Sequence, residues 1–231
     1  MPEVERVREV FRNIPGIYDR MNTYMSMGMD IFWRLRLLEM IPAGGRVLDV
    51  GTGTGKLESL NGFKGDFIGI DVTREMMLLN GNRGKLILGS ATKMPIKSGT
   101  LDAIISSFVL RNLPSTEDYF DEGMRTLKTG GLMANLDAFP ERRRLMGKFF
   151  SFYFYRLIPR LAKLISSSGA YDYLAMSVKN FKVPEVIAEE MKGAGFRDVN
   201  IKRFRSPSAA IVYGWKGPVL NHQQKAQAIN R

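Results

Sequence analysis

A glycine-rich turn after a short apolar run is the first feature of this chain that could do chemistry. The stretch VLDVGTGTGKL (47–57) places Asp49 near the end of the apolar run, and Gly51, Gly53 and Gly55 follow in alternation. Glycine allows backbone conformations and a close approach to a ligand that a side chain would block. The spacing differs from the G-x-G-x-x-G of dinucleotide sites, and the GK[ST] of a phosphate-binding loop is missing. We therefore expect a nucleoside cofactor without phosphates.

A second acidic residue supports this interpretation. Asp71 ends the next apolar run, DFIGID (66–71). A carboxylate at the end of the second strand lies where ribose hydroxyls bind in nucleotide folds. A glycine-rich turn alone is also typical of an ordinary strand–helix connection, but the loop and Asp71 together favour a nucleoside pocket. The predicted cofactor is S-adenosylmethionine, in contact with Asp49, Gly51, Thr52, Gly53, Thr54, Gly55 and Asp71.

The composition excludes several kinds of chemistry. The chain has no cysteine and a single histidine, His222, in a polar C-terminal stretch. Disulfides, thiolate nucleophiles and Cys-based metal sites are therefore excluded, and a histidine base is disfavoured. We expect no metal site, and chemistry carried by Asp, Glu, Arg, Tyr, Asn, Lys or water. Because the N-terminus lacks the apolar core of a secretory signal and no run of about 18 apolar residues occurs, we expect a cytoplasmic protein.

The elements that position these residues alternate between strand-like and helix-like stretches. Strands are predicted at 46–50, 66–71, 85–89, 101–110 and 130–139, and helices at 73–80 and 115–128. Such alternation predicts a parallel sheet with helices on both faces. Helical spacing at 4–12 and 31–41, interrupted by Pro15, Gly16 and Gly28, predicts an N-terminal cap. A helix at 184–196 and two strands, 198–204 and 208–216, close the fold.

We predict a single domain over residues 1–216. Its parts are a helical N-terminal cap (1–41), a cofactor-binding core (42–140), a basic aromatic insertion (141–182) and a C-terminal helix with two strands (183–216). Residues 217–231 are expected to form a disordered tail. The net charge of +11 lies in the second half, because residues 1–140 hold 17 basic and 17 acidic side chains, whereas 141–182 hold nine basic and two acidic ones.

The insertion combines this charge with six aromatic residues between Phe149 and Tyr155. An apolar face edged by cations suits a helix at an anionic membrane surface, here 142–165. A lid helix packed on the core with a solvated basic edge is an equal alternative. Basic and aromatic residues also mix in RNA-binding surfaces, which keeps an RNA methyltransferase open. The aromatics are consecutive, however, and no NPPY- or DPPY-type motif follows the fourth strand, so we do not expect nucleic acid as a partner.

Four further segments make the chain similar to the ubiquinone/menaquinone-biosynthesis C-methyltransferase family: 10–28, 32–42, 106–115 and 171–178. The most specific pieces are Tyr18-Asp19-x-x-Asn22, the GTGTG loop and Leu110-Arg111-Asn112. The resemblance implies an α/β, Rossmann-like class I methyltransferase fold. Its mostly parallel seven-stranded sheet would carry an antiparallel strand pair at the C-terminal end. It also implies methyl transfer from S-adenosylmethionine to a ring carbon of a polyprenylated quinol.

The resemblance also assigns individual positions. It implies cofactor contacts for Thr54, Asp71, Ser90, Ala91 and Ser107. Three features depart from the family: Ser90 replaces a usual Asn or Asp, Asp137 replaces a usual Glu, and the stretch between Gly55 and Phe67 is short, which predicts a trimmed first core helix.

For catalysis, a phenol with a pKa of about 10 must lose its proton before the ring carbon reacts. Arg111 would stabilise the phenolate or orient a water, and Asn112 would hold the second ring oxygen. The resemblance implies that Tyr18 closes over the substrate. Each also has an ordinary structural interpretation, as a capped loop or a packed aromatic. Another lipid substrate and a non-catalytic cofactor-binding protein stay as alternatives, and the particular quinone and a homodimer stay open.

Overall fold

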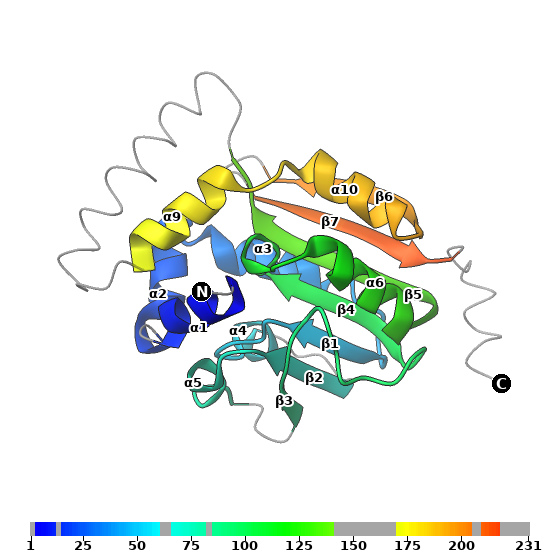
Figure 1. Cartoon of the computed structure of the whole chain (residues 1–231), viewed down its shortest axis with the longest axis horizontal. Helices are drawn as coiled ribbons and strands as arrows, with labels where there is room; N and C mark the ends of the chain where they lie inside the picture. Colours follow the sequence, from blue (N-terminus) through cyan, green and yellow to red (C-terminus); the bar gives the residue numbers. More distant parts are fainter. Residues whose placement is uncertain are drawn as a thin grey trace.

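The structure is a computed structural model that describes residues 3–12, 15–60, 66–81, 85–140, 170–204 and 209–217. A seven-stranded sheet has the order β3-β2-β1-β4-β5-β7-β6 (Figure 1). Its strands are β1 (Arg46–Val50), β2 (Asp66–Asp71), β3 (Leu86–Leu88), β4 (Leu101–Ser107), β5 (Leu127–Ala138), β6 (Phe196–Arg203) and β7 (Ala209–Lys216). The first five strands pair in parallel, and β7 runs antiparallel to both β5 and β6. The predicted sheet with its antiparallel C-terminal pair is confirmed.

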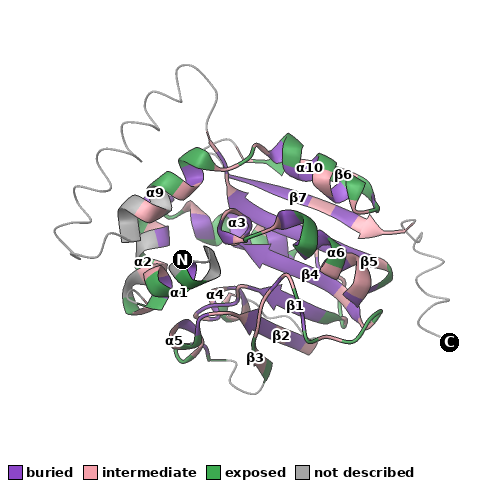
Figure 2. Cartoon of the chain, in the orientation of Figure 1, coloured by how far each residue is buried: buried purple, intermediate pink, exposed green. Residues whose placement is uncertain are grey.

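Helices cover both faces of this sheet. Successive side chains of a strand point to opposite faces, so each central strand contributes side chains to two apolar layers. Val47 and Ile105 pack with Trp33 and Leu37 of helix α3 (Met29–Leu38) on one face. Leu48 and Ile104 pack on the other face, against residues of α6 (Thr116–Thr126) and α10 (Pro184–Gly193). The central strands are therefore buried on both sides (Figure 2). This explains their nearly continuous apolar sequence.

The other helices are α1 (Glu3–Arg12), α2 (Pro15–Met25), α4 (Lys56–Ser59), α5 (Arg74–Met77) and α9 (Ala170–Asn180). The trimmed first core helix is confirmed, since α4 is only four residues long. The predicted start of α6 is also confirmed: Ser115 caps it by accepting a hydrogen bond from the backbone N–H of Asp118 at 3.0 Å. Such a cap satisfies a donor that the first helical turn leaves free.

The N-terminal cap differs from the sequence prediction at its centre. Pro15 and Gly16 were expected to interrupt it, but they begin α2. Proline is tolerated in the first turn of a helix, where its missing N–H has no partner to lose. The chain leaves helical geometry at Met27 and Gly28, whose φ angles are 52° and 79°. The cap therefore consists of three helices rather than two.

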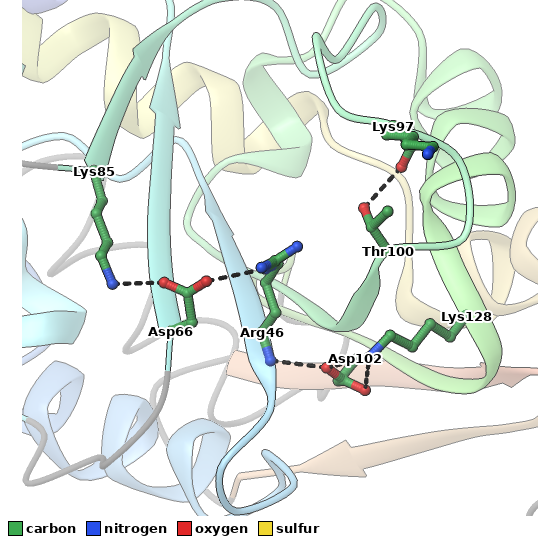
Figure 3. A network of polar contacts seen from close by, with 7 residues as sticks. All are labelled: Arg46, Asp66, Lys85, Lys97, Thr100, Asp102 and Lys128. Carbon is green, nitrogen blue, oxygen red and sulfur yellow. Dashed lines mark hydrogen bonds and ion pairs between the residues drawn. The ribbon is translucent and has the colours of Figure 1, made fainter. Parts of the chain in front are cut away.

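Charged side chains tie the amino ends of the strands together, on the edge away from the cofactor loop. Asp66, at the start of β2, accepts hydrogen bonds from Lys85 Nζ at 2.6 Å and from Arg46 Nε at 2.9 Å (Figure 3). Asp102 of β4 accepts from the backbone N–H of Arg46 and from Lys128 Nζ, each at 2.8 Å. These pairs are exposed, so each contributes about 0–1 kcal/mol. This edge therefore serves stability.

The carboxyl ends of β1 and β4 mark the point where the strand order reverses. Ligands of open α/β sheets bind at such a switch point. Helices α1 and α2 lie beyond these strand ends (Figure 1). Among the described residues, no helix is long and apolar enough to cross a bilayer. The predicted interfacial segment 142–165 and the tail from 218 onward lie outside the described residues, and the division into one domain stays a prediction.

Candidate cofactor and active site

A cavity opens at the carboxyl ends of β1, β2 and β4, with about 870 Å³ of empty space that includes its mouth to solvent. The sheet side contributes the glycine loop and the ends of the strands, and the N-terminal cap contributes the opposite wall. The predicted site residues that line it are Tyr18, Gly51, Thr52, Gly53, Thr54, Asp71, Ser90, Ala91, Ser107 and Asn112. Asp49, Gly55 and Arg111 are absent from its lining.

The three glycines of the loop all have positive φ angles, 66° at Gly51, 52° at Gly53 and 78° at Gly55. A Cβ atom at Gly51 would lie 2.4 Å from Val109 Cγ2, and one at Gly55 would lie 2.4 Å from Asn80 Oδ1. Gly53 differs because it lines the cavity, where a Cβ would meet Met76 Cε at 3.3 Å. Gly51 and Gly55 thus let the loop pack, and Gly53 keeps the ligand side free of a side chain.

Asp71 is held at the end of β2 by the loop itself. Its Oδ2 accepts the backbone N–H of Gly53 at 2.9 Å, and its Oδ1 accepts that of Thr73 at 2.7 Å. Burial raises the pKa of Asp71, and these hydrogen bonds oppose the shift. Each carboxylate oxygen can accept more than one hydrogen bond. The carboxylate therefore retains acceptor capacity toward the cavity, which suits a pair of ribose hydroxyls.

A second pair of carboxyls lies behind the loop. Thr52 Oγ1 donates to Glu58 Oε1 at 2.8 Å. Asp49 Oδ1 and Glu58 Oε2 are buried and have no hydrogen-bond partner among the described residues. Burial, and then the charge of Glu58, raise the pKa of Asp49 well above its ordinary value. Neither carboxyl lines the cavity, but the negative charge of the pair behind its wall suits a ligand that carries a cationic amino group, such as S-adenosylmethionine. Glu58 was not predicted as a site residue.

The cavity wall around Ser90 is polar only in part. Ser90 and Ala91 line the cavity together with Leu113 and Pro114. The Ser90 hydroxyl lies 3.0 Å from the Thr92 hydroxyl and accepts the Thr92 backbone N–H at 3.2 Å. Its hydrogen bonds therefore serve the local turn, where the longer side chain usual in the family would extend further.

Arg111 and Asn112 follow β4 in a 3₁₀ turn (Leu110–Asn112) and take different positions. Asn112 lines the cavity, and its Oδ1 accepts from Tyr173 Oη of α9 at 3.2 Å. Arg111 forms an ion pair with Asp137 of β5, and the two side chains are 4% and 0% exposed. Its Nε also donates to Ser177 at 3.2 Å. The guanidinium thus lies behind the cavity wall. Its charge would therefore reach a substrate through a neighbouring residue that lines the cavity.

That neighbour is Phe108, whose ring lines the cavity between two cations. The guanidinium carbon of Arg111 lies 5.7 Å from the ring centroid, and that of Arg34 lies 5.0 Å from it. Phe108 has a φ of 63°, which is rare for a bulky residue and is typical of functional sites. Tyr18 lies in the same field: burial raises the pKa of its phenol, and the charges of Arg111 and Arg34 oppose the shift.

The N-terminal cap is tied to the cofactor loop by a side-chain pair. Thr54 Oγ1 donates to Asp19 Oδ2 at 2.8 Å. The predicted cofactor contact of Thr54 therefore involves a hydroxyl that already holds α2 in place. Phe11 of α1 packs against Tyr18 with ring centroids 5.3 Å apart, and both line the cavity.

Sequence reasoning missed Arg34 of α3, a buried residue of the cavity wall. A signal was present in the spacing. Asp30, Trp33, Arg34, Leu37 and Leu38 recur at intervals of three and four residues, so they share one helical face. Because that face is apolar at Trp33, Leu37 and Leu38, it predicts that the two charged residues are buried as well.

The comparisons with known proteins agree with this geometry. The model of the ubiE/COQ5 methyltransferase family matches residues 2–216. The chain belongs to this family. It is 33% identical to a demethylmenaquinone methyltransferase of Roseiflexus sp., covering 93% of this chain and 94% of that protein. It is 34% identical to a ubiquinone/menaquinone biosynthesis C-methyltransferase of Desulfotalea psychrophila, covering 91% and 90%.

Solved structures agree on the fold. A SAM-dependent methyltransferase from Thermotoga maritima covers 90% of this chain and 99% of its own, with a TM-score of 0.65 and 17% identity. A phosphoethanolamine N-methyltransferase from Haemonchus contortus, solved with S-adenosylmethionine, has a TM-score of 0.59 over 81% of this chain and 53% of its own, with 14% identity. The predicted class I fold, the family and a methyltransferase that uses S-adenosylmethionine are confirmed.

Proposed function

We propose that this chain transfers a methyl group from S-adenosylmethionine to a ring carbon of a prenylated hydroquinone of the demethylmenaquinol type. The observation that carries the proposal is the similarity to enzymes named for this substrate, which extends over nine-tenths of the chain and of the relatives. The cavity supports it, since Val7, Phe11 and Phe108 contribute apolar side chains to its lining that suit a hydroquinone ring.

The cofactor would be held by Gly53, Asp71, Ser90 and Ala91, with its amino group toward Asp49. When bound, it supplies an electrophilic methyl group on a sulfonium. The remaining task for the protein is to place the ring carbon in line with that methyl, and this alignment provides much of the rate of such a displacement. We assign this task to Tyr18 and Asn112, which line the cavity from the cap and from the turn after β4.

The ring must also lose a phenolic proton. Tyr18 indicates how a phenol is affected in this cavity. The charges of Arg111 and Arg34 lower the pKa of its phenol, against the larger effect of burial. A substrate phenol beside Phe108 would experience the same two charges. We therefore propose that Arg111 favours the phenolate through space, with water as the proton acceptor.

The hydroquinone carries a prenyl chain, which is held in a lipid bilayer. We therefore propose that the protein works at the cytoplasmic face of a membrane, with the basic aromatic segment 142–165 as its contact. Sedimentation with vesicles that contain anionic lipid, compared with neutral vesicles, tests this. Failure of the protein to sediment with either kind of vesicle would refute the membrane contact.

The function is tested by incubating the protein with S-adenosylmethionine labelled on its methyl group. One arm contains demethylmenaquinol and the other contains total tRNA. We expect label on the quinol ring carbon and none on RNA. Label on RNA alone would favour the alternative enzyme class. Label in neither, with the cofactor still bound, would favour a cofactor-binding protein without this activity.

A further inference from the structure

Arg34 carries a buried charge that its neighbours satisfy only in part. Its side chain is 5% exposed, and the residue lines the cavity. Nη1 donates to Ser107 Oγ at 2.6 Å, whereas Nε is buried without a hydrogen-bond partner among the described residues. The carboxylate of Asp30 lies 3.9 Å from Nε, beyond hydrogen-bond range. A buried guanidinium ordinarily has its donors paired, because a buried charge without partners is costly.

Two carboxyls behind the glycine loop, outside the cavity lining, are under-partnered as well. Asp49 Oδ1 and Glu58 Oε2 are buried and lack hydrogen-bond partners among the described residues. The charge of Arg34 lowers the pKa of both carboxyls against the larger effect of burial, so the guanidinium and the carboxyls are close enough to interact. A guanidinium with one spare donor, near two carboxyls that each have one unpartnered oxygen, complements a ligand that carries an anion and a cation together. An α-amino acid group is such a ligand.

We propose that Arg34, which lines the cavity, binds the α-carboxylate of the methionyl part of the methyl donor, while the negative charge of the Asp49–Glu58 pair behind the glycine loop attracts its amino group. The proposal rests on the proposed function, since it requires S-adenosylmethionine as the ligand. The hydrogen bond of Arg34 to Ser107 and its stacking on Phe108 hold the guanidinium at the end of β4. Arg34 belongs to α3, so this contact joins the N-terminal cap to the cofactor. Recognition of the amino-acid end thus comes from outside the glycine loop.

The experiment compares two ligands by calorimetric titration. They are S-adenosylmethionine and its decarboxylated form, S-adenosylmethioninamine, which lacks only the carboxylate. Wild-type protein should bind the decarboxylated ligand roughly 10- to 100-fold more weakly, as expected for loss of a hydrogen-bonded ion pair. Arg34→Gln should weaken S-adenosylmethionine binding by a similar factor. It should change binding of the decarboxylated ligand by no more than about twofold.

Arg36→Gln is the matched control, because Arg36 lies on the same helix but is exposed and paired with Glu39. It should leave both affinities unchanged. If Arg34→Gln loses affinity for both ligands equally, the proposal is overturned in favour of a structural role. Unchanged cofactor binding with a higher KM for the quinol would also overturn it and would assign Arg34 to the substrate.

The comparison in the wild-type protein does not depend on the folding of any variant. Equal affinity for the two ligands there would refute the carboxylate contact while leaving S-adenosylmethionine as the cofactor. Wild-type protein that binds neither ligand would refute the cofactor, and this inference with it.

Discussion

The ion pair between Arg111 and Asp137 offers the sharpest test of how the site is held together. We consider the replacement Asp137→Asn, which keeps the shape and removes the charge. The carboxylate accepts from Arg111 and from the backbone N–H of Ala138 at 2.7 Å, and it is fully buried. After the replacement, the Arg111 guanidinium would be buried without its counter-charge. Removing one partner of a buried pair costs about 3–5 kcal/mol.

That cost converts to a measurable shift. For a chain of this length, each kcal/mol lowers the unfolding midpoint by about 2–4 °C, so we expect a loss of roughly 6–20 °C. Thermal unfolding followed by circular dichroism measures it, and urea unfolding gives the free energy independently. Glu39→Gln is the control, because the Arg36–Glu39 pair has the same charge type at 42% and 55% exposure. It should change stability by about 0–1 kcal/mol.

A double replacement, Arg111→Met with Asp137→Leu, separates stability from function. Replacing a buried ion pair by apolar residues is often neutral or stabilising, so the double variant should regain most of the stability. Methyl transfer should be lost in the double variant, because the charge of Arg111 behind Phe108 is gone. If Asp137→Asn unfolds at the same temperature as Glu39→Gln, the two groups do not form a charged pair and the reasoning fails.

Two further outcomes are expected. Gly53→Ala should weaken cofactor binding at least about tenfold in a calorimetric titration, because its Cβ would enter the cavity beside Met76. Gly44→Ala is the control, since Gly44 has a similar positive φ but open space around it, and it should leave cofactor binding unchanged. Asp49→Asn should stabilise the free protein in mildly alkaline buffer while weakening cofactor binding. The folded wild-type protein holds the Asp49 proton more tightly than the unfolded chain, so its free energy of unfolding falls as pH rises from about 4 through the raised pKa. Unfolding at about pH 5 and about pH 8 checks this, and an equally steep pH dependence in the variant would contradict it.

The sequence by itself determined the elements of the sheet and the position of the cofactor loop. The strands at 46–50 and 66–71 were predicted at their observed bounds. The Ser115 cap and the shortened helix after Gly55 were also predicted. These features depend on local physics: apolar runs between turns, a side-chain oxygen three residues from a free N–H, and backbone angles that favour glycine.

Only the tertiary structure decided how charges are paired around the cavity. Asp137 lies 26 residues from Arg111, and Ser107 lies 73 residues from Arg34, so no local spacing joins them. Because of this pairing, Arg111 lies behind the cavity wall and Arg34 lies in that wall. Glu58 likewise acquires its role because the loop folds it toward Asp49. Side-chain spacing shows which face of an element a charge occupies, but the partner across that face is determined only when distant elements pack and exclude water.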